Sequence, residues 1–242
     1  MIKTVGIIGY GHFGSFVHQL VERFFPDIEV RVYSRRQDPD GSTFFSHADT
    51  AQADIVVLCG AIREYEEQLK SVLAVAPPET IIVDVATVKK HTSELMRTYC
   101  EGRRFISTHP MFGPESYEKH AGDVSGFRIV VTDYALSNDD YQVVKHAFAL
   151  FGFVAIEMTA EEHDRRLAET LFLTHYVSRS IIEADFSRTR IDTLSFQFLM
   201  DAVDSVRDDA ALFQDVYRFT PYCRDVAERF HAAQERVYQG LQ

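Results

Sequence analysis

The chain has 242 residues, of which 46% are hydrophobic and 25% charged, and its 25 basic and 36 acidic residues give a formal net charge of −11. These values are ordinary for a globular protein and exclude a disordered or fibrous chain. The acidic balance argues against a nucleic-acid or anionic-membrane partner, because both would repel the protein.

The cysteines predict neither a disulfide framework nor a zinc site, because there are only three and none has CxxC spacing. No basic-then-apolar leader precedes the first apolar run, and no run approaches the ~18 residues of a membrane span. We therefore expect a cytoplasmic protein without a metal or a membrane segment.

Apolar runs and helical patterns alternate through the first part of the chain. Strands are expected at 5–8, 29–33, 55–59, 81–85, 105–107, 129–131 and 153–156. Several of these runs are continuously apolar, as in strands that are buried on both faces. Helices are expected between them, over 13–25, 65–75, 91–99 and 139–151. This alternation predicts an α/β domain over residues 1–158, with a Rossmann-type, doubly wound parallel sheet.

The last of these helices shows a cap and an apolar stripe. Asn138 or Asp139 is expected to cap it, because both side chains favour the N-cap position. The stripe expected to face the core consists of Val143, Val144, Ala147 and Leu150.

After Met158 the strand pattern stops, and helices are expected over 161–185, 191–206, 208–219 and 221–239. Pro221 suits the first position of the last helix. Residues 159–242 thus form an all-helical domain that is too small to bury its apolar faces alone. We expect it to form a homodimer with a second copy.

A glycine-rich turn, GYGHFG, follows the first strand and opens a helix. Gly9 permits the tight turn, Gly11 lets the backbone approach a pyrophosphate, and Gly14 brings the helix against the strand. At the helix N-terminus, the backbone N–H groups near His12 and Phe13 can hold phosphate. The turn therefore predicts a dinucleotide cofactor.

The end of the second strand lacks the acid that usually binds the ribose 2′-hydroxyl of NAD. The chain has Ser34, Arg35 and Arg36 at this point. A hydroxyl and two guanidinium groups can bind a 2′-phosphate, which favours NADP over NAD. Asp38 is close enough to leave mixed specificity open.

Two further strand ends carry side chains suited to chemistry. In DVATVK, the Thr87 hydroxyl is expected to point to the nicotinamide side; the alternative is a strand-end turn with a solvated Lys89. In STHPMFGPES, His109 stands in a rigid turn and can accept a proton near neutral pH. A structural histidine is the alternative there.

The first long helix of the C-terminal part contains His175 and Arg179, which are four residues apart and share a face. They indicate an anion site or, alternatively, a solvated basic stripe. His163 and Asp164 are expected to cap and anchor this helix rather than to take part in chemistry.

Together, the glycine turn, DVATVK, THPMFGPES and HD…THYVSR resemble the prephenate/arogenate dehydrogenase family, and THPMFGPES is closest to the plant-type arogenate dehydrogenases. The resemblance implies an NAD(P)-binding domain followed by a helical dimerisation domain. It implies that His109 hydrogen-bonds the ring hydroxyl of the substrate, and that Thr87 replaces a serine that orients the same hydroxyl. Arg179 beside His175, with Arg218 as the less favoured alternative, then binds the substrate's carboxylate, and an acid such as Asp209 pairs with the ammonium group of arogenate.

The activity implied is the oxidative decarboxylation of arogenate to tyrosine, or of prephenate to 4-hydroxyphenylpyruvate, with NADP as hydride acceptor. Three alternatives stay open: a prephenate-specific NAD-dependent dehydrogenase, a 3-hydroxyacid or imine reductase, and a non-catalytic NADP-binding regulatory protein. The reductase is disfavoured because residues 161–185 contain no lysine.

Overall fold

The computed structural model describes residues 2–242 and divides the chain into two compact units. The first unit ends at His163 and the second is Asp164–Gln242. The predicted boundary between residues 158 and 159 falls slightly earlier, just before helix α7 (Ala160–Leu167).

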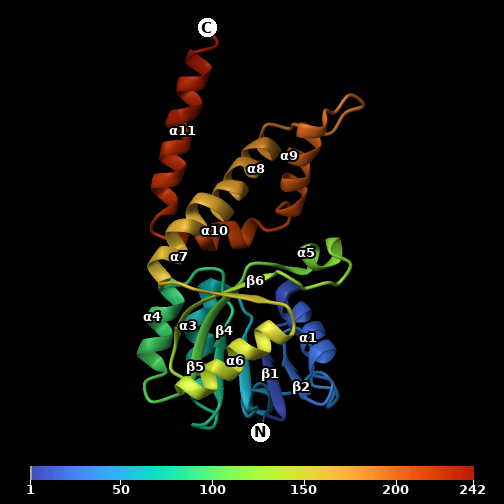
Figure 1. The fold of residues 1–242 in the computed structure, drawn as a ribbon, viewed down its shortest axis with the longest axis vertical. Helices are drawn as coiled ribbons and strands as arrows, with labels where there is room; N and C mark the ends of the chain where they lie inside the picture. The colour runs from blue at the N-terminus through green and yellow to red at the C-terminus, as the bar shows by residue number, and fades with distance from the viewer. Residues whose placement is uncertain (1) are drawn as a thin grey trace. The chain divides into compact units, whose positions relative to one another are not determined.

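The first unit is built on one seven-stranded sheet (Figure 1). The strands are β1 (Thr4–Ile8), β2 (Glu29–Tyr33), β3 (Ile55–Leu58), β4 (Ile81–Asp84), β5 (Phe105–Pro110), β6 (Arg128–Tyr134) and β7 (Val154–Glu157). Their order is β2-β1-β3-β4-β5-β6-β7. The order reverses at β1, so the carboxyl ends of β1 and β3 border the crevice where such sheets bind ligands.

The sheet is parallel from β1 to β5, as predicted, but β6 runs antiparallel to β5 and β7 is parallel to β6. The last two strands therefore run against the other five, which corrects the expectation of a fully parallel sheet. Only the short helix α5 (Pro114–Lys119) lies between β5 and β6. A parallel neighbour would need a full crossover connection.

Helices cover both faces of this sheet. One face carries α1 (His12–Phe24) and α6 (Asn138–Leu150), and the other carries α2 (His47–Ala51), α3 (Tyr65–Leu73) and α4 (Lys90–Tyr99). Helix α1 packs Phe16 into one apolar cluster, and Val17 and Val21 into another. The short helices α2 and α5 were not predicted, because five or six residues carry no helical periodicity.

Two expectations for α6 are wrong. The N-cap is Ser137, whose hydroxyl accepts the Asp140 N–H at 3.1 Å. Val143 and Leu150, expected to face the core, are 68% and 71% exposed. Tyr141 is buried, and Val144 and Phe148 are partly buried and pack against the same core cluster. The prediction is therefore confirmed for Val144, while Tyr141 and Phe148 take the places expected for Val143 and Leu150.

The second unit is helical, as predicted. After α7 come a π-helical turn (Ala168–Phe172) and α8 (Leu173–Glu183), then α9 (Leu194–Ser205), α10 (Ala210–Phe219) and α11 (Cys223–Gln239). Pro221 lies before α11, whose N-cap is Tyr222, so its predicted helical position is wrong. Within residues 2–242, no helix has the length and apolar character needed to cross a membrane.

Candidate functional site

The glycine turn between β1 and α1 requires glycine at two of its positions. Gly9 has φ of +103°, and a Cβ there would lie 3.0 Å from the Cys59 carbonyl carbon. A Cβ on Gly14 would lie 2.1 Å from the Gly9 carbonyl oxygen. Any other residue would push α1 away from β1, so these two glycines set the close approach of helix and strand.

The N-terminus of α1 is open. Gly11 is its N-cap, with no side-chain capping hydrogen bond, and a Cβ on Gly11 would meet nothing within 4 Å. The amides that begin with His12 and Phe13 therefore point toward accessible space, as an anion-binding helix end requires. The His12 side chain is 69% exposed, with Nε2 3.4 Å from an Oε1 of Glu115. This arrangement fits the pyrophosphate of a dinucleotide.

The end of β2 carries Ser34, Arg35 and Arg36 as expected, but it also has an acid nearby. The Ser34 hydroxyl oxygen accepts the Arg36 N–H at 3.2 Å. Arg35 is 72% exposed, and its Nη2 binds Oε2 of Glu64 at 2.6 Å. Glu64 ends the single 3₁₀ turn Ile62–Glu64 that follows β3. This contact could not be predicted from the sequence, because the two partners are 29 positions apart.

The end of β4 is organised around a buried ion pair. Oδ2 of Asp84 lies 2.7 Å from Nζ of Lys89, and both side chains are fully buried. The Thr92 and Ser107 hydroxyls donate to the same oxygen at 2.7 and 3.1 Å, and the Ala86 N–H donates to Oδ1 at 2.8 Å. A solvated Lys89 is therefore wrong: α4 begins just after it and its side chain turns inward.

Thr87 lies within the same strand-end turn and is half-buried. Its hydroxyl makes no hydrogen bond to another residue in the described chain, so it can donate to or accept from a ligand. The predicted role of Thr87 stays a proposal.

His109, near the end of β5, is buried, and its Nδ1 lies 2.9 Å from Nε2 of His163. The backbone beside it is fixed: the Lys89 ammonium donates to the Thr108 carbonyl, and the Thr108 hydroxyl donates to the Asp84 carbonyl at 2.8 Å. Burial, and secondarily His163 and Lys89, hold the pKa of His109 well below its ordinary 6.5. His109 is therefore neutral near pH 7 and able to accept a proton.

The contact between His163 and His109 was not predicted from the sequence. His163 was expected to cap a helix, but the Thr159 hydroxyl caps α7 by accepting the Glu162 N–H at 3.1 Å. His163 is buried and points to His109 instead. The sequence signal was the pair His163-Asp164 itself. This pair does not identify its partner, because His109 is 54 positions away.

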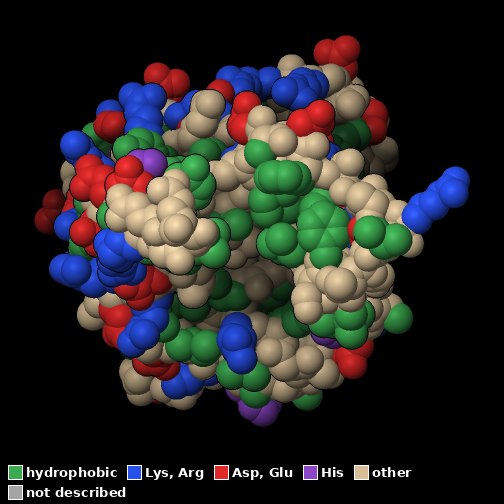
Figure 2. All heavy atoms as spheres, turned by 90° about the horizontal axis from the view of Figure 1, so that it is seen from above, with side chains coloured by type: hydrophobic (Ala, Val, Ile, Leu, Met, Phe, Trp, Pro, Cys, Tyr) green, Lys and Arg blue, Asp and Glu red, His purple; other side chains and the backbone are tan. Residues whose placement is uncertain are grey.

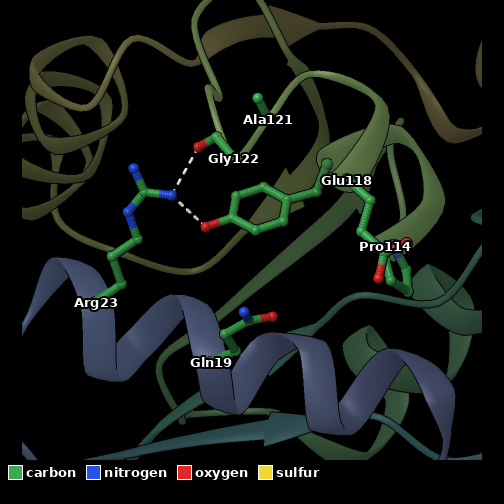
Figure 3. A pocket seen from close by; sticks show the side chains of 7 residues that line it. Gln19, Arg23, Pro114, Glu118, Ala121 and Gly122 are labelled. Carbon is green, nitrogen blue, oxygen red and sulfur yellow. Dashed lines mark hydrogen bonds between the residues drawn. The ribbon is translucent and has the colours of Figure 1, made fainter.

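A cavity of about 410 Å³ lies between α1 and α5, away from the glycine turn (Figure 3). Its walls are formed by Gln19, Arg23, Pro114, Tyr117, Glu118, Ala121 and Gly122. Nη1 of Arg23 donates to the Gly122 carbonyl at 2.6 Å and to the Tyr117 hydroxyl. Arg23 thus fastens α5 and the following loop to α1, and the cavity contains none of the predicted site residues.

In the second unit, His175 and Arg179 are both on α8, as predicted. His175 is buried and its ring stacks on Phe213 with centroids 6.1 Å apart. Burial, followed by the charge of Arg179, lowers the pKa of His175 to about 4. Nη2 of Arg179 donates to the Arg207 carbonyl at 2.9 Å. In the described part of the chain, His175 Nδ1 and Arg179 Nε are buried without a hydrogen-bond partner.

Two acidic residues lie close to Arg207 in the sequence. Asp204 is bound to two cations, Arg188 at 2.9 Å and Arg207 at 2.8 Å. Asp209 is half-buried at the N-cap of α10, where its side chain makes no capping hydrogen bond. Asp209 lies two positions after Arg207, whose carbonyl accepts the hydrogen bond from Arg179. Among residues 2–242 no group of three His, Cys, Asp or Glu side chains could hold a metal ion.

The fold and the glycine turn together define a Rossmann-type nucleotide-binding protein with a helical second unit. A family profile described as "Prephenate dehydrogenase, nucleotide-binding domain" matches residues 41–150. Arogenate dehydrogenase 1, chloroplastic, of Arabidopsis thaliana is 29% identical over 98% of this chain and 39% of its own length. The chain thus spans well under half of that plant relative.

Two solved structures show the same fold. Prephenate dehydrogenase from Aquifex aeolicus, in complex with hydroxyphenyl propionate and NAD+, has a TM-score of 0.77 at 17% identity, covering 99% of this chain and 90% of that one. Synechocystis arogenate dehydrogenase has a TM-score of 0.70 at 17% identity, with coverages of 98% and 91%. These comparisons show that the chain is similar to the prephenate/arogenate dehydrogenase family.

Proposed function

We propose that this chain is an NADP-dependent arogenate dehydrogenase, active as a cytoplasmic homodimer. The reaction is arogenate and NADP+ to tyrosine, CO₂ and NADPH. The observation that carries the proposal is His109: a buried, neutral imidazole near the end of strand β5, in a sheet whose glycine turn fits a dinucleotide.

His109 would remove the proton of the ring hydroxyl while the hydride leaves the same ring carbon. The opposite carboxylate departs as CO₂, and the electron pair of the broken C–C bond completes the aromatic ring. Thr87 would orient the hydroxyl from the neighbouring strand end. When bound at the glycine turn, a nicotinamide dinucleotide supplies the hydride acceptor. The protein contributes orientation and the proton acceptor, and the latter is typically worth ~10²–10⁴-fold in rate.

Arogenate is proposed over prephenate because of the polar groups on the helical unit. Both substrates need a cation for the side-chain carboxylate, and Arg179 has a buried Nε without a partner among residues 2–242. Only arogenate has an ammonium group, which Asp209 could bind. The name of the plant relative agrees with this choice.

NADP is proposed over NAD because Arg35 and Arg36 replace the ribose-binding acid at the end of β2. Nicotinamide cofactors differ here only in the 2′-phosphate, which two guanidinium groups can neutralise.

The proposed activity is tested by following cofactor reduction with arogenate and with prephenate. We expect a higher kcat/KM for arogenate. His109→Asn should keep the fold and cofactor binding but lose about 10²–10⁴-fold in kcat, while His146→Asn, on the exposed side of α6, should not. If neither substrate reduces the cofactor, the proposed function is wrong. If prephenate is preferred, only the substrate assignment fails.

A further inference from the structure

We propose that His163 is a positioning residue: its Nε2 accepts the Nδ1–H of His109, and this bond keeps the other ring nitrogen of His109 unprotonated and available to the substrate. The proposal rests on the proposed function insofar as His109 is the proton acceptor. It adds a second residue, on helix α7, that determines which ring nitrogen of His109 accepts the proton.

The contact is enclosed and specific. Both histidines are buried, at 5% and 3% exposure, and the two nitrogens are 2.9 Å apart. The rings meet edge to face, with an interplanar angle of 73°. Within residues 2–242, Nε2 of His109 has no hydrogen-bond partner. The nitrogen that faces His163 is therefore engaged, and Nε2 is left for a ligand.

Only one proton fits between two imidazole nitrogens at this distance. If it belongs to His109, Nε2 of His109 carries a lone pair and can accept the hydroxyl proton of a substrate. If it belongs to Nε2 of His163, neutral His109 must carry its own proton on Nε2 and cannot act as a base. The direction of this one hydrogen bond thus decides whether the site is competent.

The groups around His109 keep its ring neutral, so its reactivity depends on which nitrogen carries the proton. The Lys89 ammonium lies near His109, held between the Asp84 carboxylate and the Thr108 carbonyl. This cation and the burial of both rings disfavour an imidazolium, so His109 stays neutral and exists as one of two tautomers. A hydrogen bond that only held α7 against β5 would form equally well with either tautomer of His109. A bond that positions the catalytic nitrogen requires the tautomer with the proton on Nδ1.

Ring-nitrogen NMR of ¹⁵N-histidine-labelled protein reads the tautomer directly, without substrate. In the wild type we expect His109 to carry its proton on Nδ1, with Nε2 showing the shift of an unprotonated nitrogen. A proton on Nε2 of His109 would overturn the proposal, whatever the enzyme's activity.

Two variants test the consequence for turnover. His163→Leu removes the acceptor, so we expect His109 to move its proton to Nε2 and kcat to fall about 10²-fold with little change in KM, by analogy with a wrongly oriented catalytic histidine. His163→Gln can place Oε1 where Nε2 was, and should restore the Nδ1–H tautomer and most of kcat. His146→Leu, an exposed site on α6, is the matched control and should change neither.

The outcomes separate this inference from the proposed function. An unchanged kcat in His163→Leu, or a Gln variant that behaves like Leu, would refute the positioning role even if the enzyme oxidises arogenate. A wild type with the expected tautomer but no dehydrogenase activity would refute the proposed function instead. If His163→Leu does not fold, the wild-type spectrum and the Gln variant still decide the matter.

Discussion

At the end of β2, Arg35 can pair with either of two anions. In the structure its partner is Glu64, at 2.6 Å, in an ion pair whose side chains are 72% and 34% exposed. Because Arg35 is exposed to solvent, this ion pair is screened and contributes little to stability. A 2′-phosphate carries more charge and can accept a forked hydrogen bond from arginine, so it should displace Glu64. With NADP as the proposed cofactor, Glu64 would weaken its binding without preventing it.

Arg35→Gln should therefore raise KM for NADP by roughly 10-fold or more, since a charged hydrogen bond contributes about 1.5–3 kcal/mol, and should leave KM for NAD almost unchanged. Glu64→Gln should lower KM for NADP by a few-fold. Steady-state kinetics with both cofactors measures these effects, and Arg97→Gln, at an exposed arginine on α4, is the control. Equal changes for NADP and NAD would exclude the 2′-phosphate role.

His175 couples the stability of the helical unit to pH. Its pKa is about 4 in the folded protein, against 6.5 ordinarily, because the ring is buried beside Arg179. The unfolded chain therefore binds a proton more readily, and stability is lost as pH falls from about 6.5 toward 4.

We expect this residue to remove roughly 2 kcal/mol of stability between pH 7 and pH 5. Over the same pH range, the free energy of unfolding of His175→Gln should fall by roughly 2 kcal/mol less than that of the wild type. Urea unfolding at the two pH values measures this difference. The same pH dependence in variant and wild type would show that His175 does not remain neutral in the folded protein.

At the scale of single elements, the end of β4 depends on the buried pair of Asp84 and Lys89. Removing one partner leaves the other charge buried and uncompensated, which typically costs 3–5 kcal/mol. Asp84→Asn and Lys89→Met should each lower the free energy of unfolding by about this amount.

The double variant should cost clearly less than the sum of the two single variants, because neither charge then remains. Thermal or denaturant unfolding of the four proteins gives the coupling. Strict additivity would mean that the two charges do not stabilise each other.

Elements with a local signature could be predicted from the sequence. The seven strands, the main helices and the glycine turn follow from apolar runs, periodicity and the spacing of Gly9, Gly11 and Gly14. The reversed direction of β6 could not be predicted, because an apolar run carries no strand direction.

Contacts between distant residues were missed for a different reason. A lysine in this position is expected at the surface, and the burial of Lys89 becomes evident only when α4 packs against β4. The partner of His163 depends likewise on the packing of α7 against the end of β5. The residue types at the site were thus predictable, whereas the pairs Arg35–Glu64, Asp84–Lys89 and His109–His163 required the structure.

At the scale of the whole molecule, the helical unit carries large hydrophobic side chains at its surface. On α9, Leu194 and Phe198 are 64% and 65% exposed, and on α11 Val237 and Tyr238 are 67% and 66% exposed. Figure 2 shows hydrophobic side chains lying beside one another on the face it displays. Exposed apolar surface of this kind is typical of an interaction site.

We expect light scattering at micromolar concentration to give the mass of a homodimer. Leu194→Glu with Phe198→Glu should shift the protein toward monomer, because charges would be buried in the interface. Val143→Glu, which places a charge at an exposed valine of α6 in the first unit, should leave the mass unchanged. A monodisperse wild-type monomer would refute the dimer.

We propose above all that a neutral His109 assists hydride loss from the carbinol carbon of a cyclohexadienol. The most direct measurement uses arogenate with deuterium on that carbon, and determines by mass spectrometry where the label goes. We expect one deuterium to appear in NADPH for each tyrosine and CO₂ formed, and His109→Asn to form all three products at the same greatly reduced rate. Reduced cofactor without deuterium, or CO₂ released without cofactor reduction, would contradict it.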